Sequence, residues 1–183
     1  MKAAYSPTRL DVKALAQAED HLEGETPLQE CERLLAEMIP SPETAPFIHW
    51  RAQGEWRERL GGASQCWLHV TAQVRLPLVC QRCMGAVEML LAVDRSFRFV
   101  ADEATAARED EESEEDLLVL SPQFDLMGLI EDELLMALPL VPRHEPDCPT
   151  PVQLSAQDAG FDEAGAEGRP HPFAALAQLK RKH

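Results

Sequence analysis

The sequence predicts an α+β domain in which helices cover an antiparallel β-meander of three to four strands or more. Two observations lead to this prediction. Apolar residues recur at helical spacing over residues 28–39, and they then alternate with mostly polar residues over residues 48–56, 66–78 and 87–99. Long strands with one apolar face each, joined in sequence, are typical of an antiparallel meander. We expect the N-terminal helices to cover the apolar face of that sheet.

Two helices are expected before the first strand. Thr8 begins a helix-capping pattern, so the first helix is predicted over about residues 9–20, and Gly24 ends that region. The pair Thr26-Pro27 then provides a cap and a suitable first-turn residue for a second helix. The apolar stripe of this second helix consists of Leu28, Cys31, Leu34, Leu35, Met38 and Ile39, and Pro40 ends it.

The three strands follow in order. The first is marked by the alternating positions Ile48, Trp50, Ala52, Gly54 and Trp56, and Gly61-Gly62 supplies the turn after it. The second and third strands are separated by Cys80-Gln81-Arg82-Cys83, which therefore lies at a turn. On the second strand Cys66 has the apolar parity, whereas Trp67, His69 and Arg75 have the polar parity.

Residues 102–116 hold nine acidic residues and one arginine. Such a density of like charge, with few apolar residues, predicts a solvated, flexible and disordered loop. The alternative interpretation is a docking segment for a basic partner.

The remainder of the chain divides into a last core region and a tail. Residues 117–120 suit a short fourth strand, and Asp125 can cap a helix whose apolar stripe extends to Leu138. Pro139 and Pro142 end that helix. We therefore predict one α+β domain over residues 1–142. The tail at 143–183, rich in Pro, Gly and acids, is expected to be partly ordered, with a short terminal helix that starts at Pro172.

The charge balance limits the classes of function. The chain has 17 basic and 32 acidic residues, a net charge of -15, which opposes nucleic-acid binding through overall charge. No apolar run reaches the roughly 18 residues of a membrane span, and the N-terminus lacks the pattern of a signal peptide. A cytoplasmic protein without membrane contact is therefore expected. Its 5 cysteines are then more typical of thiols or metal ligands than of a disulfide framework.

Two pairs of residues have the spacing of metal ligands. Cys80 and Cys83 flank the predicted turn, and His144 and Cys148 follow the last predicted helix. Together they would form a Cys₃His set, which is typical of a closed, structural zinc site. The two pairs are far apart in sequence, so only the fold can bring them together. The alternative is two unrelated thiol sites, with the Cys-x-x-Cys pair shaping a turn.

Other chemistry finds less support in the sequence. A thioredoxin-like use of Cys80 and Cys83 normally requires a helix after the first thiol, whereas here strand follows strand. A zinc-dependent hydrolase would need an open metal position and a nearby base, and no convincing base is evident. Direct contact with RNA or a partner is assigned to Trp67, Arg75 and Arg82, because an exposed indole can stack and arginine can pair with phosphate. The alternative for Trp67 is burial under a helix.

Three segments together resemble the bacterial YceD family, the large ribosomal RNA subunit accumulation proteins. They are LPLVCQRCMGAVE, IEDELLMALPLVPRHEPDC and the terminal HPFAALAQLKRKH. Their order, spacing and near-terminal position agree with the family, and Met84 stands where leucine is expected. The resemblance implies a non-enzymatic role in the synthesis, processing or stability of 23S ribosomal RNA.

The acidic charge adds a mechanism to this resemblance. We expect an adaptor that binds a ribosomal protein or an rRNA-processing enzyme, with rRNA contacted directly or indirectly. The alternatives are a direct RNA-binding module that uses a local basic patch, and a zinc-dependent hydrolase.

Overall fold

The computed structural model describes residues 5–40, 46–59, 61 and 63–150. The chain divides into two units, Met1–Thr150 and Pro151–His183. The second unit lies outside the described residues, and so does the terminal helix predicted to start at Pro172. All the described helices and strands belong to the first unit.

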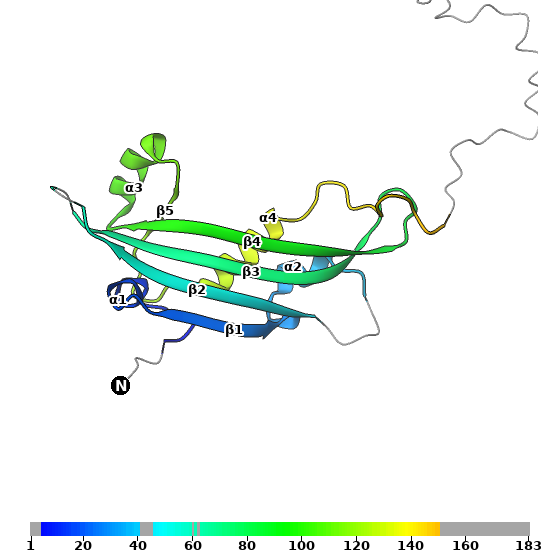
Figure 1. The fold of residues 1–183 in the computed structure, drawn as a ribbon, viewed down its shortest axis with the longest axis horizontal. Coiled ribbons are helices and arrows are strands. Elements are labelled where there is room, and N and C mark those ends of the chain that lie inside the picture. Colours follow the sequence, from blue (N-terminus) through cyan, green and yellow to red (C-terminus); the bar gives the residue numbers. More distant parts are fainter. Residues whose placement is uncertain (1–4, 41–45, 60, 62, 151–183) are drawn as a thin grey trace, which may run out of the picture. The chain divides into compact units, whose positions relative to one another are not determined.

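Five strands form one sheet in the order β1-β2-β3-β4-β5. Their bounds are β1 (His21–Pro27), β2 (Phe47–Arg57), β3 (Gln65–Val79), β4 (Ala86–Val100) and β5 (Asp116–Val119). The first four run antiparallel to their neighbours, and β5 runs parallel to β4 (Figure 1). The helices are α1 (Val12–Gln17), α2 (Glu32–Glu37), α3 (Glu103–Glu109) and α4 (Leu126–Met136), with short 3₁₀ segments η1 (Leu28–Glu30) and η2 (Asp110–Glu112). The predicted α+β class with an antiparallel meander is confirmed.

The longest feature is the hairpin of β3 and β4. Each strand has 15 residues, so the hairpin extends over roughly 50 Å at the usual rise per strand residue. Its register is continuous from Cys66 opposite Phe99 to Val79 opposite Ala86. The Cys-x-x-Cys pair lies in the turn that joins the two strands, as the alternation predicts.

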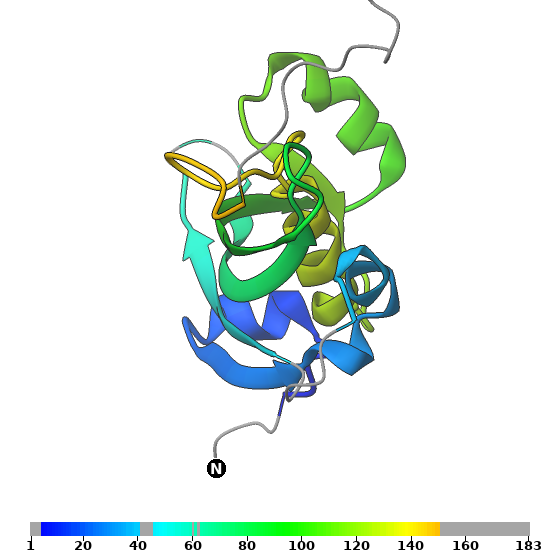
Figure 2. The ribbon, with the colours of Figure 1, turned by 90° about the vertical axis from the view of Figure 1, so that its right-hand side faces the viewer.

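One face of the sheet is covered by helices, whereas the opposite face is open over its middle and is covered at one end, where Arg98 meets the α3 segment. The apolar residues of the alternating pattern are buried, and α1 packs on β2 and β3 whereas α4 packs on β3 and β4 (Figure 2). Gly54 makes the close approach of α1 to β2 possible, because a Cβ there would lie 2.6 Å from the Ala16 nitrogen. We call the opposite surface the open face; its exposed side chains include His49, Arg51, Gln73, Arg75, Leu90, Ala92 and Asp94.

The first predicted helix is wrong at both ends. Asp11, not Thr8, caps α1, since its carboxylate accepts the Ala14 N–H at 2.9 Å. The chain then enters the edge strand β1, which periodicity did not indicate. Gly24 does not end a helix: it lies in β1, where a Cβ would come within 2.9 Å of the Trp50 ring. The glycine therefore makes room for a buried indole on the neighbouring strand.

The second predicted helix is also shortened. Thr26-Pro27 ends β1 and caps no helix, because the Thr26 hydroxyl accepts the Trp50 indole N–H at 2.9 Å. A buried indole needs such an acceptor. Helical structure is limited to η1 and α2, and the predicted apolar stripe remains on the inside through Leu28, Cys31 and Leu34.

The predicted unstructured acidic loop over residues 102–116 is wrong in its secondary structure. Asp102 caps α3 by accepting the Thr105 N–H at 2.7 Å, and η2 follows. The mostly buried Arg98 guanidinium donates to Glu109 at 2.8 Å, to the Ser113 hydroxyl at 2.8 Å and to Glu115 at 2.9 Å. A buried cation requires partners of opposite charge, so part of the acidic segment is used internally.

The last elements agree with the sequence. The predicted fourth strand is β5, and α4 begins after Asp125, whose carboxylate accepts the Gly128 N–H at 3.0 Å. The stripe residues Leu126, Ile130 and Leu134 are fully buried. No helix among the described residues is long and apolar enough to cross a membrane.

Candidate metal centre

The turn between β3 and β4 brings two thiols to one side. Cys80 donates its N–H to Gly85 O at 2.8 Å, and Met84 donates to Cys80 O at 2.9 Å. Met84 takes a left-handed backbone conformation, with φ of 60°, to complete this tight turn. Cys80 is fully buried, and Cys83 is half-buried in the same turn.

The chain after α4 returns to this turn. The Gln81 N–H donates to Pro142 O at 2.8 Å, and the Arg82 guanidinium pairs with Asp147 at 3.2 Å. His144 adds a hydrogen bond of 2.9 Å between its Nε2 and the carbonyl of Ala86, at the start of β4. Three contacts from different residues therefore fix the return segment against the turn.

The four residues predicted as ligands converge. The Sγ atoms of Cys80, Cys83 and Cys148 and a ring nitrogen of His144 all lie within 4.8 Å of one another. Cys80 Sγ is 3.8 Å from Cys148 Sγ, and Cys83 Sγ is 3.6 Å from His144 Nδ1. Zn–S bonds of about 2.3 Å and a Zn–N bond of about 2.05 Å at tetrahedral angles place such atoms about 3.8 and about 3.6 Å apart. The arrangement fits one tetrahedral ion.

The hydrogen bond to Ala86 selects the tautomer of His144. A carbonyl accepts only, so Nε2 must carry the proton, and the lone pair of Nδ1 then faces Cys83. A ligating histidine that donates its other N–H to a carbonyl is the usual outer arrangement of metal sites. The backbone of β4 thus orients the imidazole as a ligand.

The thiols differ in acidity. Burial alone would raise the pKa of Cys80, but hydrogen bonds from the backbone N–H groups of Cys83, Arg82 and His144 favour its thiolate and lower the pKa. Burial, and then the neighbouring Cys83 and Cys80 thiols, raise the pKa of Cys148 to about 11. One thiolate is therefore already favoured, and an incoming cation would displace the proton of Cys148. Three sulfurs and one imidazole are the donors that zinc prefers.

The other predicted contact residues are not brought together. Trp67 lies near one end of β3 and Arg82 in the turn beyond the other end, while Arg75 is exposed on the open face between them. Trp67 has the polar parity, but the residue is only 9% exposed, and the Arg57 guanidinium lies 4.0 Å from its ring centroid. Its cross-strand neighbour Arg98 donates to Glu109, the last residue of α3, so that helix also lies near this end of the face.

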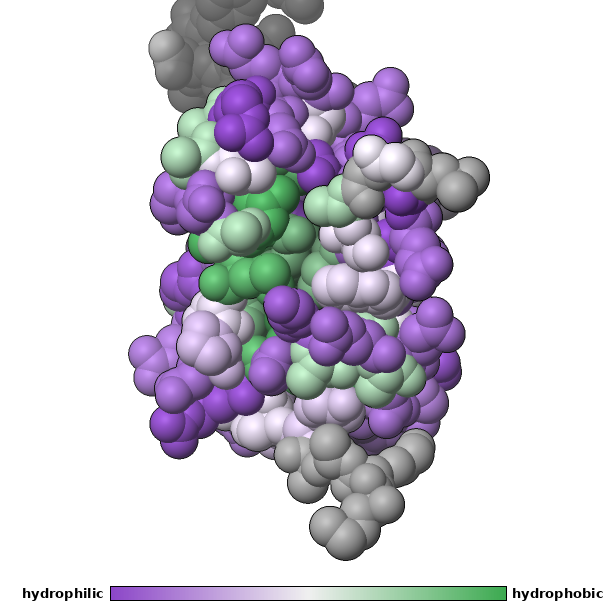
Figure 3. Space-filling view, turned by 90° about the vertical axis from the view of Figure 1, so that its left-hand side faces the viewer, coloured by the Kyte–Doolittle hydropathy of each residue, from purple (hydrophilic) through white to green (hydrophobic). Residues whose placement is uncertain are grey.

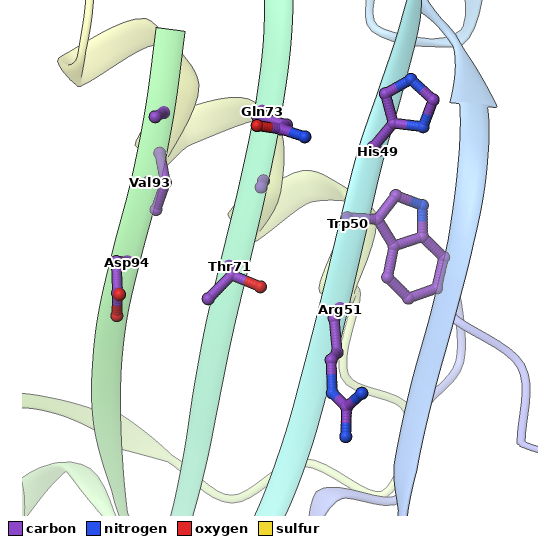
Figure 4. Close-up of a pocket in the computed structure, with 9 residues that line it drawn as sticks. His49, Trp50, Arg51, Thr71, Gln73, Val93 and Asp94 are labelled. Carbon is purple, nitrogen blue, oxygen red and sulfur yellow. The ribbon is translucent and has the colours of Figure 1, made fainter.

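Two surface hollows were not evident from the sequence. The first lies on the open face, where the short side chains of Thr71 and Ala92 leave a depression between His49, Arg51 and Asp94 (Figure 4). The second lies at the end of the sheet near the turn between β2 and β3, and its lining combines apolar residues such as Phe99 and Leu120 with charged ones such as Arg59 and Arg98 (Figure 3). The alternating pattern predicts that Thr71 and Ala92 face solvent. It does not predict the hollow, which forms between residues of neighbouring strands.

Comparison with known proteins gives consistent matches. The profile of a family described as "Large ribosomal RNA subunit accumulation protein YceD" matches residues 68–180. A protein of that name from Haemophilus influenzae is 36% identical over 112 residues, which cover 60% of this chain and 63% of the relative. The match thus spans less than two thirds of the relative's length. No solved structure matches the chain.

Proposed function

Since the chain belongs to the YceD family of large ribosomal RNA subunit accumulation proteins, we propose that it is a non-catalytic factor for 23S rRNA. The observation that carries this proposal is the family match over residues 68–180, which include the β3–β4 hairpin, α4 and all four converging ligands. Its action would support the synthesis, processing or stability of 23S rRNA in the cytoplasm.

The proposed mode of action is that of an adaptor. A net charge of -15 opposes attraction to phosphate, and it favours partners of opposite charge. A basic ribosomal protein, or an rRNA-processing enzyme with a basic surface, has the complementary chemistry. Contact with rRNA would then be made mainly through the partner.

The proposed metal is one structural zinc ion. The donor set and its distances support this choice, and four protein ligands leave no position for water or substrate. Such a closed site favours a structural role over the alternative of a zinc-dependent hydrolase. The ion would join the β3–β4 turn to the segment that follows α4, and so stabilise the end of the hairpin.

Affinity purification tests the adaptor role. The tagged protein, recovered from lysate with and without nuclease, should retain a basic protein partner in both cases. Loss of every partner after nuclease treatment would instead support direct RNA binding. The family-level role is tested separately: cells that lack the protein should contain less mature 23S rRNA relative to 16S rRNA.

A further inference from the structure

Part of β4 is a free sheet edge. β5 pairs only with Phe97–Val100, and His144 contacts the carbonyl of Ala86 at the opposite end of the strand. Between these points, none of the residues that the structure describes pairs with the outer side of residues 90–96 (Figure 1). We call residues 90–96 the free β4 edge. A free edge of this kind is a template for another strand.

The hydrogen-bonding groups of this edge can be assigned. The Leu120 N–H donates to Val100 O at 2.9 Å, and His144 Nε2 donates to Ala86 O, so both carbonyls point away from β3. The β3–β4 register has no bulge between these points. Alternate residues of a strand direct their N–H and C=O to the same side. The outward groups therefore belong to the even-numbered residues Leu90, Ala92, Asp94 and Ser96.

Apolar side chains flank the edge. Leu140 and Val141 line a hollow with Val87 and Met89 of β4, and they are 100% and 60% exposed. Met136, 67% exposed, is the last residue of α4 and precedes this stretch in the chain. Leu90 is 51% exposed on the open face. Exposed apolar side chains thus lie next to one end of the free β4 edge, beside Val87 and Met89, and such a cluster is typical of an interaction site.

The described charges around the edge are acidic on balance: the carboxylates of Glu88, Asp94, Asp116, Glu133 and Glu145 outnumber the cations Arg75, Arg95 and Arg143, and His69 lies 3.4 Å from Asp94. Glu88 and Asp94 are exposed on the open face, while Arg95 already contacts Asp116 and Glu133. A second copy of this chain would add another net charge of -15, and nucleic acid would also add negative charge. Charge complementarity therefore selects a basic occupant.

We propose that the free β4 edge binds an extended basic segment of a partner protein, which adds to the sheet as a sixth strand. Its backbone pairs with Leu90, Ala92, Asp94 and Ser96, its basic side chains lie beside Glu88 and Asp94, and its apolar side chains contact the Leu140 side. This proposal specifies where the adaptor would bind its partner, and it rests on the proposed adaptor function.

Peptide binding to the full chain tests the proposal. The probe is a peptide of alternating Lys and Val; the controls are an alternating Glu and Val peptide and the Lys-Val sequence with every backbone nitrogen methylated. Hydrogen exchange should become slower at the amides of Leu90, Ala92, Asp94 and Ser96 with the Lys-Val probe alone. Binding without protection of these amides, equal binding of the methylated peptide, or no binding of the Lys-Val probe contradicts the proposal.

A matched pair of variants tests the edge from the protein side. Ala92→Pro removes one outward donor and leaves the groups that face β3 in place, as proline is tolerated at strand edges. Ala92→Val keeps the donor. We expect Ala92→Pro to weaken binding of the Lys-Val probe at least tenfold and Ala92→Val to change it less than twofold. Equal affinity of a folded Ala92→Pro protein would overturn the proposal, and the methylated peptide decides if that variant does not fold.

The two proposals can fail separately. Suppose that deletion of the gene lowers the ratio of 23S to 16S rRNA and that the Ala92→Pro protein restores this ratio fully. The free β4 edge is then not the docking site, while the rRNA role stands. If deletion leaves the ratio unchanged but the edge amides are protected by the Lys-Val probe, the edge binds peptide and the rRNA role is wrong.

Discussion

His144 shows how one backbone carbonyl can decide the chemistry of a site. Ala86 O accepts from Nε2, which leaves Nδ1 as the atom that faces the thiols. Because Ala86 also begins β4, the orientation of the ring depends on the hairpin being formed. Metal affinity and folding of the hairpin are therefore coupled in this protein.

Cys83→Ser tests that coupling. The purified wild-type chain should carry about one zinc per chain, and the variant should lose it because one of four ligands is gone. A typical substitution destabilises a protein by roughly 1 kcal/mol. The melting temperature of Cys83→Ser should fall by more than such a loss would cause. Elemental analysis and thermal unfolding with and without a chelator measure both effects.

Cys66→Ala provides the matched control. Cys66 is a buried core thiol whose pKa burial raises to about 11, and it lies outside the ligand cluster. This variant should lose some stability and keep its zinc. Zinc retained by Cys83→Ser, or lost equally from both variants, would show that the four residues do not form the site.

At the scale of elements, the long β3–β4 hairpin and α4 could be predicted because their apolar patterns are strong and uninterrupted. Strand β1 could not be predicted, because Gly24 and Thr26 have the sequence pattern of helix ends. In the structure Gly24 leaves room for the Trp50 ring of the next strand, and Thr26 accepts the Trp50 indole N–H. The ordered structure of the acidic segment could not be predicted from its own residues either. It depends on Arg98, which precedes the segment and is buried in the tertiary fold.

The candidate metal site was predictable in its residues but not in its assembly. Spacing identified each pair of ligands, because a Cys-x-x-Cys turn presents two thiols to one side. Whether His144 and Cys148 reach that turn depends on where α4 ends and on the contacts of Gln81 with Pro142 and Arg82 with Asp147. Those contacts follow from the tertiary structure and leave no local trace in the sequence.

Glu109→Gln tests the role of the acidic segment through pH. Hydrogen bonds from Arg98, and then from Arg108, hold the pKa of Glu109 below its usual range. A depressed pKa adds stability above the unfolded value of about 4.3, and this stability is lost as pH falls through the folded value. The variant should therefore be less stable than wild type at pH 7, and the difference should shrink towards pH 3. Urea unfolding at both pH values measures it.

Glu111→Gln is the control for the same charge change. Glu111 is exposed in η2 and is not among the three partners of Arg98. Its substitution should change stability little at either pH. Equal behaviour of the two variants would mean that Arg98 does not organise this segment.

At the scale of the whole molecule, net charge separates the two modes of action. The purified protein should bind duplex RNA weakly at physiological salt, because a charge of -15 opposes the phosphate attraction behind non-specific binding. Its contact with a basic partner should weaken as salt rises.

Charge reversal at Arg75 and Arg82 examines direct RNA contact. Both side chains are exposed, and Arg82 pairs with Asp147 beside the metal ligands. If the adaptor account is right, Arg75→Glu with Arg82→Glu restores the rRNA level of a deletion strain as fully as wild type. Failure of a folded, zinc-loaded variant to do so would favour direct contact through these arginines.

The proposed role of this protein depends most on its link to large-subunit RNA, and one measurement tests that link directly. Total RNA from a deletion strain, from its parent and from the strain complemented with the wild-type gene is compared for mature 23S and 16S rRNA, under fast growth and in the cold. We predict a lower ratio of 23S to 16S in the deletion strain and its return on complementation. A normal ratio under both growth conditions would contradict the proposed function.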